Sequence, residues 1–171
     1  MIADLTSTYS DNVHKTTSKP KVTNMQPRGT LHRAVIAFGS NIGNRVAHIE
    51  SALAAMKSRG LHVLDVSRIY ETKAMYYENQ DAFFNGVVLL ETDLEPLALL
   101  DTLQSIELEE GRRRDIDKGP RTLDLDIILY GSAQFNHERL KIPHPLMMER
   151  EFVLRPLSEY YDPSPKHLVG G

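Results

Sequence analysis

The 171-residue sequence contains no cysteine and no tryptophan. The lack of cysteine excludes disulfide bonds, thiolate nucleophiles and metal centres with cysteine ligands. No apolar run approaches the ~18 residues of a membrane-spanning helix, and the first residues lack the apolar core of a secretory signal. We therefore expect a cytoplasmic protein without a membrane partner.

A surplus of positive charge is also missing. The chain has 20 Lys and Arg against 23 Asp and Glu, for a net charge of −3. Proteins that bind nucleic acid non-selectively are normally basic, so we expect no nucleic-acid partner. The length fits one domain of ~100–200 residues with a sizeable core. For the isolated domain we expect a monomer.

The first thirty residues differ from the rest in composition. Nine of them are Ser or Thr, and no helical or strand period runs through them. We predict a disordered arm or linker over 1–30 and one folded domain over 31–171. A mitochondrial transit peptide stays open as an alternative, although Asp4 and Asp11 count against it. A linker cut from a longer polypeptide is equally open.

Hydrophobic periodicity predicts alternating strands and helices in the folded part. Apolar residues recur at helical spacing before two glycines that can end a helix, Gly60 and Gly111. We expect strands at 34–38, 62–70, 83–90 and 122–130, and helices at 45–59 and 96–110. A hairpin after Gly131, a short strand at 140–142 and a helical turn before Phe152 would follow. The order β-α-β-β-α-β predicts an α+β ferredoxin-like fold, with helices packed on a mainly antiparallel sheet.

Two carboxylates lie on the last of these long strands. Strict alternation would place Leu123, Leu125, Ile127 and Leu129 on one face, and Asp124, Asp126, Ile128 and Tyr130 on the other. The two aspartates would then lie about 6.5–7 Å apart along the chain. A divalent cation such as Mg²⁺ or Mn²⁺ would relieve their repulsion. On spacing alone, an ordinary solvent-facing pair of acids is an equally good interpretation.

A cluster of basic residues immediately precedes the acid pair. It holds five of the 20 basic residues of the chain, namely Arg112, Arg113, Arg114, Lys118 and Arg121. Arginine matches phosphate oxygens in a bidentate geometry, so cations beside a metal-binding acid pair indicate a polyphosphate site. The alternative is a solvated charged loop, balanced by its own aspartates.

Three other groups are weaker candidates. Gln104 and Glu107 are neighbours on one helix face and could hydrogen-bond a nucleotide base, although such pairs are more often solvated. His144 lies between two prolines, which would fix its backbone. Phe83 and Asn85 combine a ring with an amide, which suits a flat heterocycle; a core ring and a turn amide are the alternative. The sequence contains no P-loop or dinucleotide fingerprint.

Four segments occur in an order that resembles one known family. They are AFGSNIGNR at 37–45, NQDAFFNGVVLLET at 79–92, GPRTLDLDIILYG at 119–131 and IPHPLMMEREFVLRPL at 142–157. Together they resemble 6-hydroxymethyl-7,8-dihydropterin pyrophosphokinase of folate biosynthesis, over about residues 33–159. The resemblance implies an α+β ferredoxin-like fold and a reaction that transfers pyrophosphate from ATP to the pterin hydroxymethyl group and releases AMP. It also implies two Mg²⁺ ions and, in some members, fusion to other folate-pathway domains.

The resemblance also implies roles for individual residues. The catalytic positions are Arg112, Arg121, Asp124, Asp126 and His144. The metal ligands are Asp124 and Asp126. The ATP positions are Gln104, Glu107, Arg112, Arg114, Ile127, Arg139, Lys141, His144 and Arg150. The pterin positions are Thr72, Met75, Phe83, Asn85, Asp124 and Phe152. Lys118 stands where bacterial members often carry Trp.

Two rival functions are compatible with the same residues. A nuclease or nucleotidyltransferase would also use the acid pair and the arginines, but the acidic folded part disfavours long nucleic acid as substrate. A non-enzymatic ferredoxin-like module would have no reason to gather two carboxylates and five cations in fifteen residues.

Overall fold

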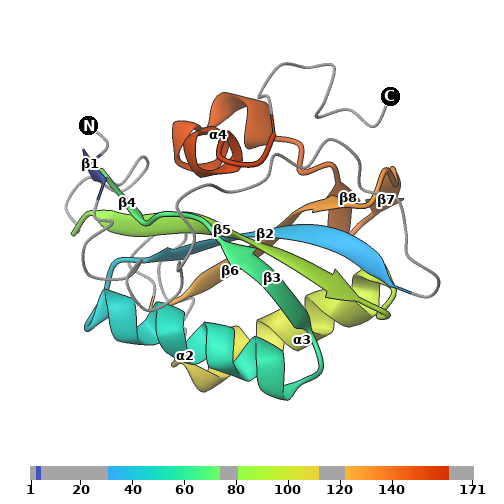
Figure 1. Ribbon diagram of the computed structural model, residues 1–171, viewed down its shortest axis with the longest axis horizontal. Helices are drawn as coiled ribbons and strands as arrows, with labels where there is room; N and C mark the ends of the chain where they lie inside the picture. The colour runs from blue at the N-terminus through green and yellow to red at the C-terminus, as the bar shows by residue number, and fades with distance from the viewer. Residues whose placement is uncertain (1–2, 5–30, 74–80, 112–121, 162–171) are drawn as a thin grey trace.

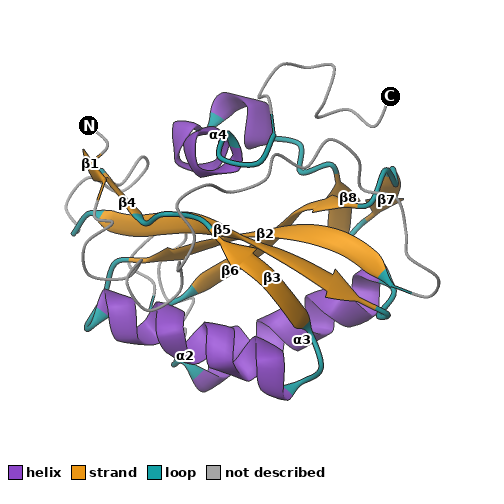
Figure 2. Cartoon of the chain, viewed as in Figure 1, coloured by secondary structure: helices purple, strands orange, loops and turns teal. Residues whose placement is uncertain are grey.

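A six-stranded antiparallel sheet forms the centre of the computed structural model, which describes residues 3–4, 31–73, 81–111 and 122–161. Helices cover both faces of this sheet (Figures 1 and 2). Residues 74–80 and 112–121, which include the basic cluster, lie outside the described residues. The same holds for Met75, Arg112, Arg114, Lys118 and Arg121, so their predicted roles stay predictions.

The sheet has the strand order of the predicted fold. Strand β2 (His32–Ser40) is central and pairs with β5 (Phe83–Thr92) on one side and with β6 (Asp124–Tyr130) on the other. Strands β3 (His62–Val66) and β4 (Tyr70–Thr72) both pair with β5. Every pairing is antiparallel, so the α+β prediction with a mainly antiparallel sheet is confirmed.

The predicted single strand at 62–70 is interrupted after Val66. Ser67 donates its backbone N–H to the Val87 carbonyl (2.9 Å), and its Oγ accepts from the Val87 N–H (2.8 Å). Its hydroxyl also donates to the Arg68 carbonyl (2.8 Å). The serine side chain therefore replaces ladder bonds at this point, and the chain leaves the sheet for three residues before β4 begins.

The predicted disordered arm contributes one short strand. Ala3 and Asp4 form β1 (Ala3–Asp4), which pairs with Glu71 and Tyr70 of β4. The unpaired backbone groups of an edge strand favour such an addition. The rest of 1–30 lies outside the described residues.

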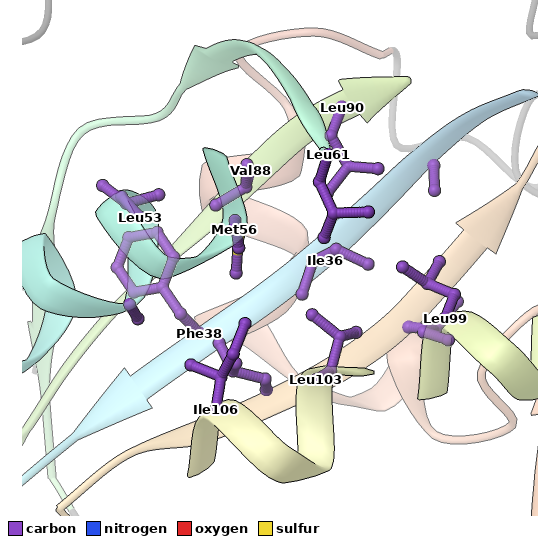
Figure 3. Packing of buried hydrophobic residues seen from close by; sticks show 14 of the residues in the cluster. Ile36, Phe38, Leu53, Met56, Leu61, Val88, Leu90, Leu99, Leu103 and Ile106 are labelled. Carbon is purple, nitrogen blue, oxygen red and sulfur yellow. The ribbon is translucent and has the colours of Figure 1, made fainter. Parts of the chain in front are cut away.

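Two long helices pack on one face of the sheet (Figure 1). Helix α2 (Arg45–Ser58) begins at the N-cap Asn44, whose Oδ1 accepts from the Ala47 N–H (3.0 Å), and is followed by Gly60 with φ +81°. Helix α3 (Pro96–Glu109) begins with proline at a position where no N–H is needed. Figure 3 shows the core beneath them, where each large apolar side chain contributes roughly 1.5–3 kcal/mol.

The other face is covered by the C-terminal part of the described chain. A 3₁₀ turn, η1 (Met147–Glu149), leads into α4 (Glu151–Leu157). Val153 and Leu157 pack against Ala37 and Val87 of the sheet in a second apolar cluster. A separate hairpin, β7 (Phe135–His137) and β8 (Leu140–Ile142), precedes this segment and contains the predicted strand at 140–142. Within the described residues, no helix has the length and apolar character needed to cross a membrane.

The alternation predicted for 122–130 is wrong at its end. Ile127 is opposite Ile36 and Leu129 is opposite Val35, so a bulge leaves Ile128 as an extra residue. Leu129 therefore lies in the α4-side cluster and Tyr130 in the α2–α3 core. The extra residue of a bulge reverses the faces of the residues after it. Asp124 and Asp126 precede the bulge and keep a common face.

Candidate active site at the edge of β6

The edge of β6 forms one wall of an open cleft of about 340 Å³. Among the described strands β6 pairs with β2 alone, and residues from both faces of β6 reach the cleft. Helix α3 and the segment from β7 to His144 supply the other walls. The lining comprises Leu100, Gln104, Glu107, Asp124, Leu125, Asp126, Ile127, Glu138, Arg139, Leu140, Lys141, His144 and Pro145.

The acid pair lies on the α4 side of β6. Asp124 is opposite Gly39 and Asp126 is opposite Ala37, and both side chains are half-buried. Among the described residues, no three His, Cys, Asp or Glu side chains are grouped as metal ligands. A cation bound by these two carboxylates would therefore complete its shell with water or ligand oxygens. That mode of binding is typical of Mg²⁺ with phosphates.

Glu107 holds the backbone between the two aspartates. Its side chain is buried, and its Oε2 accepts a hydrogen bond from the Leu125 N–H (3.0 Å). An edge strand leaves such an N–H without a partner strand, and a buried N–H without an acceptor is costly. The solvated-face alternative is therefore wrong for Glu107, which supports the strand that carries the acid pair.

Arg139 crosses the mouth of the cleft from the β7–β8 hairpin to α3. Its Nη2 donates to Asp101 Oδ1 (2.6 Å) and to Gln104 Oε1 (3.3 Å). Both members of the Arg139–Asp101 ion pair are well exposed. Lys141 lies two residues further along, on β8, and lines the same cleft. Arg139 and Lys141 are the cations of the lining within the described part of the chain.

His144 enters the cleft with one ring nitrogen already engaged. Its backbone N–H donates to the Ile128 carbonyl (3.0 Å), and its Nδ1 accepts from the Leu146 N–H (3.2 Å). The neutral ring therefore carries its proton on Nε2. Burial lowers the pKa of His144 below its usual 6.5, and the nearby Arg150 lowers it further, against the opposing effect of Asp124. His144 is thus a neutral Nε2–H donor at pH 7.

A second polar group lies on the same face of the sheet, two strands away from Asp124. Asn85 Nδ2 donates to Thr72 Oγ1 (2.6 Å), and both side chains are buried. Asn85 and Asp124 are opposite the same residue, Gly39, so their backbones lie about 9–10 Å apart, two strand spacings.

Gly39 lies between these two groups, where a side chain would contact both of them. A methyl group on Gly39 would lie 3.0 Å from Asn85 Oδ1, 3.5 Å from Phe83 Cδ1 and 4.0 Å from Asp124 Cβ. Nothing in the sequence distinguishes this role from that of a turn glycine, since Gly39 directly precedes a turn-rich loop. A glycine inside a strand is nevertheless a known sign of close approach.

The predicted site residues fall into three sets. The cleft brings together Gln104, Glu107, Asp124, Asp126, Ile127, Arg139, Lys141 and His144. Thr72, Phe83 and Asn85 gather beside Gly39. Arg150 and Phe152 lie at the start of α4, with the guanidinium carbon 5.5 Å from the ring centroid. Sequence reasoning missed Asp101, although its i, i+3 relation to Gln104 on the same helix could have indicated it.

Comparison with known proteins assigns the family. The sequence model of the 7,8-dihydro-6-hydroxymethylpterin-pyrophosphokinase (HPPK) family matches residues 35–162. The chain belongs to the HPPK family. It is 52% identical over 125 residues to the folic acid synthesis protein fol1 of Schizosaccharomyces pombe, covering 72% of this chain and 17% of fol1. It is 46% identical over 127 residues to the 2-amino-4-hydroxy-6-hydroxymethyldihydropteridine pyrophosphokinase of Bacillus subtilis, covering 74% of this chain and 76% of that protein.

Solved HPPK structures share the fold. The chain matches the Plasmodium falciparum HPPK-DHPS with a TM-score of 0.59 at 17% identity, covering 80% of this chain and 43% of that one. An HPPK-DHPS in complex with substrates gives a TM-score of 0.56 at 17% identity, covering 80% and 42%. The chain thus spans less than half of these two-part HPPK proteins, and a smaller fraction of fol1.

Proposed function

We propose that this chain transfers the pyrophosphoryl group of ATP to the hydroxymethyl oxygen of 6-hydroxymethyl-7,8-dihydropterin and releases AMP. The observation that carries the proposal is the position of Asp124. It lines the cleft with Arg139, Lys141 and His144, and it shares Gly39 as a strand neighbour with Asn85. A phosphate-binding cleft and a heterocycle-binding group therefore meet at one carboxylate. Membership of the HPPK family supports this division.

Asp124 and Asp126 would hold Mg²⁺ together with the phosphates of ATP, and we expect two ions. The donor set fits, because two half-buried carboxylates on one face leave the remaining positions to phosphate and water oxygens. When bound, the metal neutralises charge on the transferring phosphoryl groups. Arg112, Arg114 and Arg121 are proposed phosphate ligands from the sequence alone.

The pterin would lie against Asn85, Thr72 and Phe83. The hydrogen bond from Asn85 Nδ2 to Thr72 Oγ1 fixes the plane of the amide and leaves its Oδ1 beside Gly39. An amide held in this way can read the hydrogen-bonding edge of a flat ring, and Phe83 offers an apolar surface beside it. Phe152 is a proposed second surface for the ring.

On the ATP side, the side chains position and neutralise the polyphosphate. His144 donates from Nε2, since its Nδ1 already accepts from Leu146. Arg139 presents a guanidinium that Asp101 and Gln104 hold in place. Such fixed donors stabilise the negative charge of the phosphates without rearranging during the reaction. Alignment of the pterin hydroxyl with the phosphorus atom lowers the reaction barrier further. No covalent nucleophile is required.

The test is AMP release from Mg·ATP with and without 6-hydroxymethyl-7,8-dihydropterin. We expect pterin-dependent AMP without ADP. Asp126→Asn should lower turnover by at least about a thousandfold, because positioning and charge neutralisation provide most of phosphoryl-transfer catalysis. Asp93→Asn is the matched control, since Asp93 is exposed and lies outside the cleft. ADP in place of AMP, or no product from folded wild-type protein, would contradict the proposal.

The setting of the domain is a separate proposal. Relatives include the folate synthesis bifunctional protein, mitochondrial, of Arabidopsis thaliana, of which this chain covers 24% at 44% identity. We infer fusion to further folate-pathway domains, a cytoplasmic location and a monomeric isolated domain. The mass of the native polypeptide, its distribution between cytosol and mitochondria, and light scattering of the isolated domain test these three points in turn.

A further inference from the structure

The loop after β2 and the first residue of α2 are hydrogen-bonded to the two residues that precede β5. Asn41 Nδ2 donates to the Asp81 carbonyl (2.9 Å), and Arg45 Nη1 donates to the Ala82 carbonyl (2.9 Å). The Arg45 guanidinium also lies over the Phe84 ring, with its carbon 3.7 Å from the ring centroid. Asn41 and Arg45 therefore hold the backbone just before β5, and Arg45 also contacts the side chain of Phe84 in the strand.

These contacts are made on the opposite face of β5 from the proposed pterin group. Side chains alternate along a strand, so Phe84 faces the α2–α3 core while Phe83 and Asn85 face the other way. Ala82 and Phe84 flank Phe83 on both sides in the chain. An anchor on these two residues therefore helps to fix the positions of Phe83 and Asn85.

Arg45 suits this task for a chemical reason. A planar guanidinium can stack on a ring and donate sideways to a carbonyl at the same time, whereas an ammonium group cannot do both with the same geometry. Asn41 adds a bond one residue earlier and is itself buried. The ladder pairing of β5 begins at Phe83, opposite Thr72, and continues at Phe84, opposite Ser40 and Glu71. The bonds from Asn41 and Arg45 extend the constraint to the two residues just before the strand.

We propose that Arg45 is a positioning residue for the heterocycle-binding half of the active site, acting through Ala82 and Phe84 on Phe83 and Asn85. The proposal rests on the pyrophosphokinase function for its kinetic part and on the geometry alone for its structural part. The proposal predicts that loss of Arg45 weakens pterin binding and leaves ATP binding unchanged. The Arg45 contacts lie outside the cleft proposed to hold the phosphate groups.

The kinetic test compares Arg45→Met, Arg45→Lys and the control Lys57→Met, an exposed cation at the other end of α2. We expect the KM for the pterin to rise about tenfold in Arg45→Met, which is the effect of losing one charge-assisted hydrogen bond. The rise should be smaller in Arg45→Lys. The KM for ATP should stay within about twofold, as should both values in Lys57→Met. Equal changes in both KM values, or no change in the pterin KM of Arg45→Met, would overturn the proposal.

A structural readout keeps the two proposals separable. In nuclear magnetic resonance spectra of the ligand-free protein, the side-chain amide of Asn85 should shift in Arg45→Met and stay in place in Lys57→Met. Unchanged Asn85 and Phe83 signals in Arg45→Met would overturn the positioning role whatever the activity. Wild-type protein without pterin-dependent AMP would instead refute the proposed function. Arg45→Lys keeps the test valid if Arg45→Met fails to fold.

Discussion

Glu107 accepts a hydrogen bond from the backbone of Leu125, the residue between the two aspartates of the proposed metal site (Oε2–N 3.0 Å). The bond joins α3 to the outer edge of β6, where none of the described strands pairs. A carboxylate is the strongest acceptor available for a buried N–H. The edge of the sheet can therefore serve as a binding surface while the Leu125 N–H keeps an acceptor.

This relationship predicts a stability cost that depends on the acceptor. Glu107→Ala should lower the free energy of unfolding by about 1–3 kcal/mol, because the buried Leu125 N–H loses its acceptor. Glu107→Gln retains an oxygen and should cost less. Urea denaturation measures both, with Glu50→Ala on the exposed face of α2 as the control. Equal stability of Glu107→Ala and wild type would show that water replaces the carboxylate.

Gly39 predicts a defect confined to the site. A methyl group there would press on Asn85 Oδ1 at 3.0 Å, so Gly39→Ala must displace an amide that Thr72 holds. Overpacking of this kind costs roughly 1–3 kcal/mol, and we expect the KM for the pterin to rise about tenfold. The KM for ATP should change little.

Gly86→Ala provides the contrast within the same sheet. Its methyl group would meet the Phe38 ring and lie 2.8 Å from Ser67 Oγ, both of which are buried. We expect this variant to lose stability rather than substrate affinity, by more than about 3 kcal/mol. Thermal unfolding and the pterin KM are measured on both variants. Gly86→Ala should mainly lower the unfolding temperature, and Gly39→Ala should mainly raise the pterin KM. A destabilised Gly39→Ala with normal pterin affinity would contradict this assignment.

Replacement of Asp101 should weaken ATP binding with little effect on the stability of the fold. Its ion pair with Arg139 is exposed at both ends, and such pairs contribute at most about 1 kcal/mol. Asp101→Ala removes the acceptor that holds the guanidinium across the cleft, so the KM for ATP should rise roughly threefold to tenfold. Asp93→Ala is the control. A lower KM for ATP would show that Asp101 competes with the phosphates for Arg139.

Local signals made the helices and the acid pair predictable from the sequence. Asn44 and Gly60 mark the ends of α2 by their own chemistry, and the alternation around Leu125 places Asp124 and Asp126 on one face. These patterns act within a few residues, so they need no knowledge of the partner strand. The family resemblance added the list of site residues but not the contacts among them.

Contacts between distant residues account for what the sequence could not predict. The bulge at Ile128 arises from its pairing with β2, and the break after Val66 depends on Ser67 meeting Val87 twenty residues later. The role of Glu107 depends on Leu125, eighteen residues away. The local sequence around Ile128, Ser67 or Glu107 does not indicate these partners. The site residues that sequence reasoning missed, Asp101 among them, are likewise defined by the element opposite them.

His144 predicts a pH dependence with a definite sign. Burial and the nearby Arg150 hold its pKa below 6.5, and Asp124 opposes them. As the pH falls below about 6.5, the unfolded chain takes up this proton before the folded protein does. The contribution of His144 therefore makes the protein less stable toward lower pH, until the pH reaches the folded pKa. Above about 6.5 both states are neutral and the effect disappears.

A titration of the His144 ring by nuclear magnetic resonance, in metal-free protein without ligands, checks this directly. We expect a midpoint below 6.5, and a weaker decline in stability between pH 7 and 5 in His144→Gln. Protonation places a hydrogen on Nδ1, which must then give up the Leu146 N–H that it accepts at 3.2 Å. The backbone bond and the low pKa thus favour the same neutral tautomer. A midpoint at or above 6.5 would mean that Asp124 outweighs burial and Arg150, and that His144 meets the phosphates as a cation.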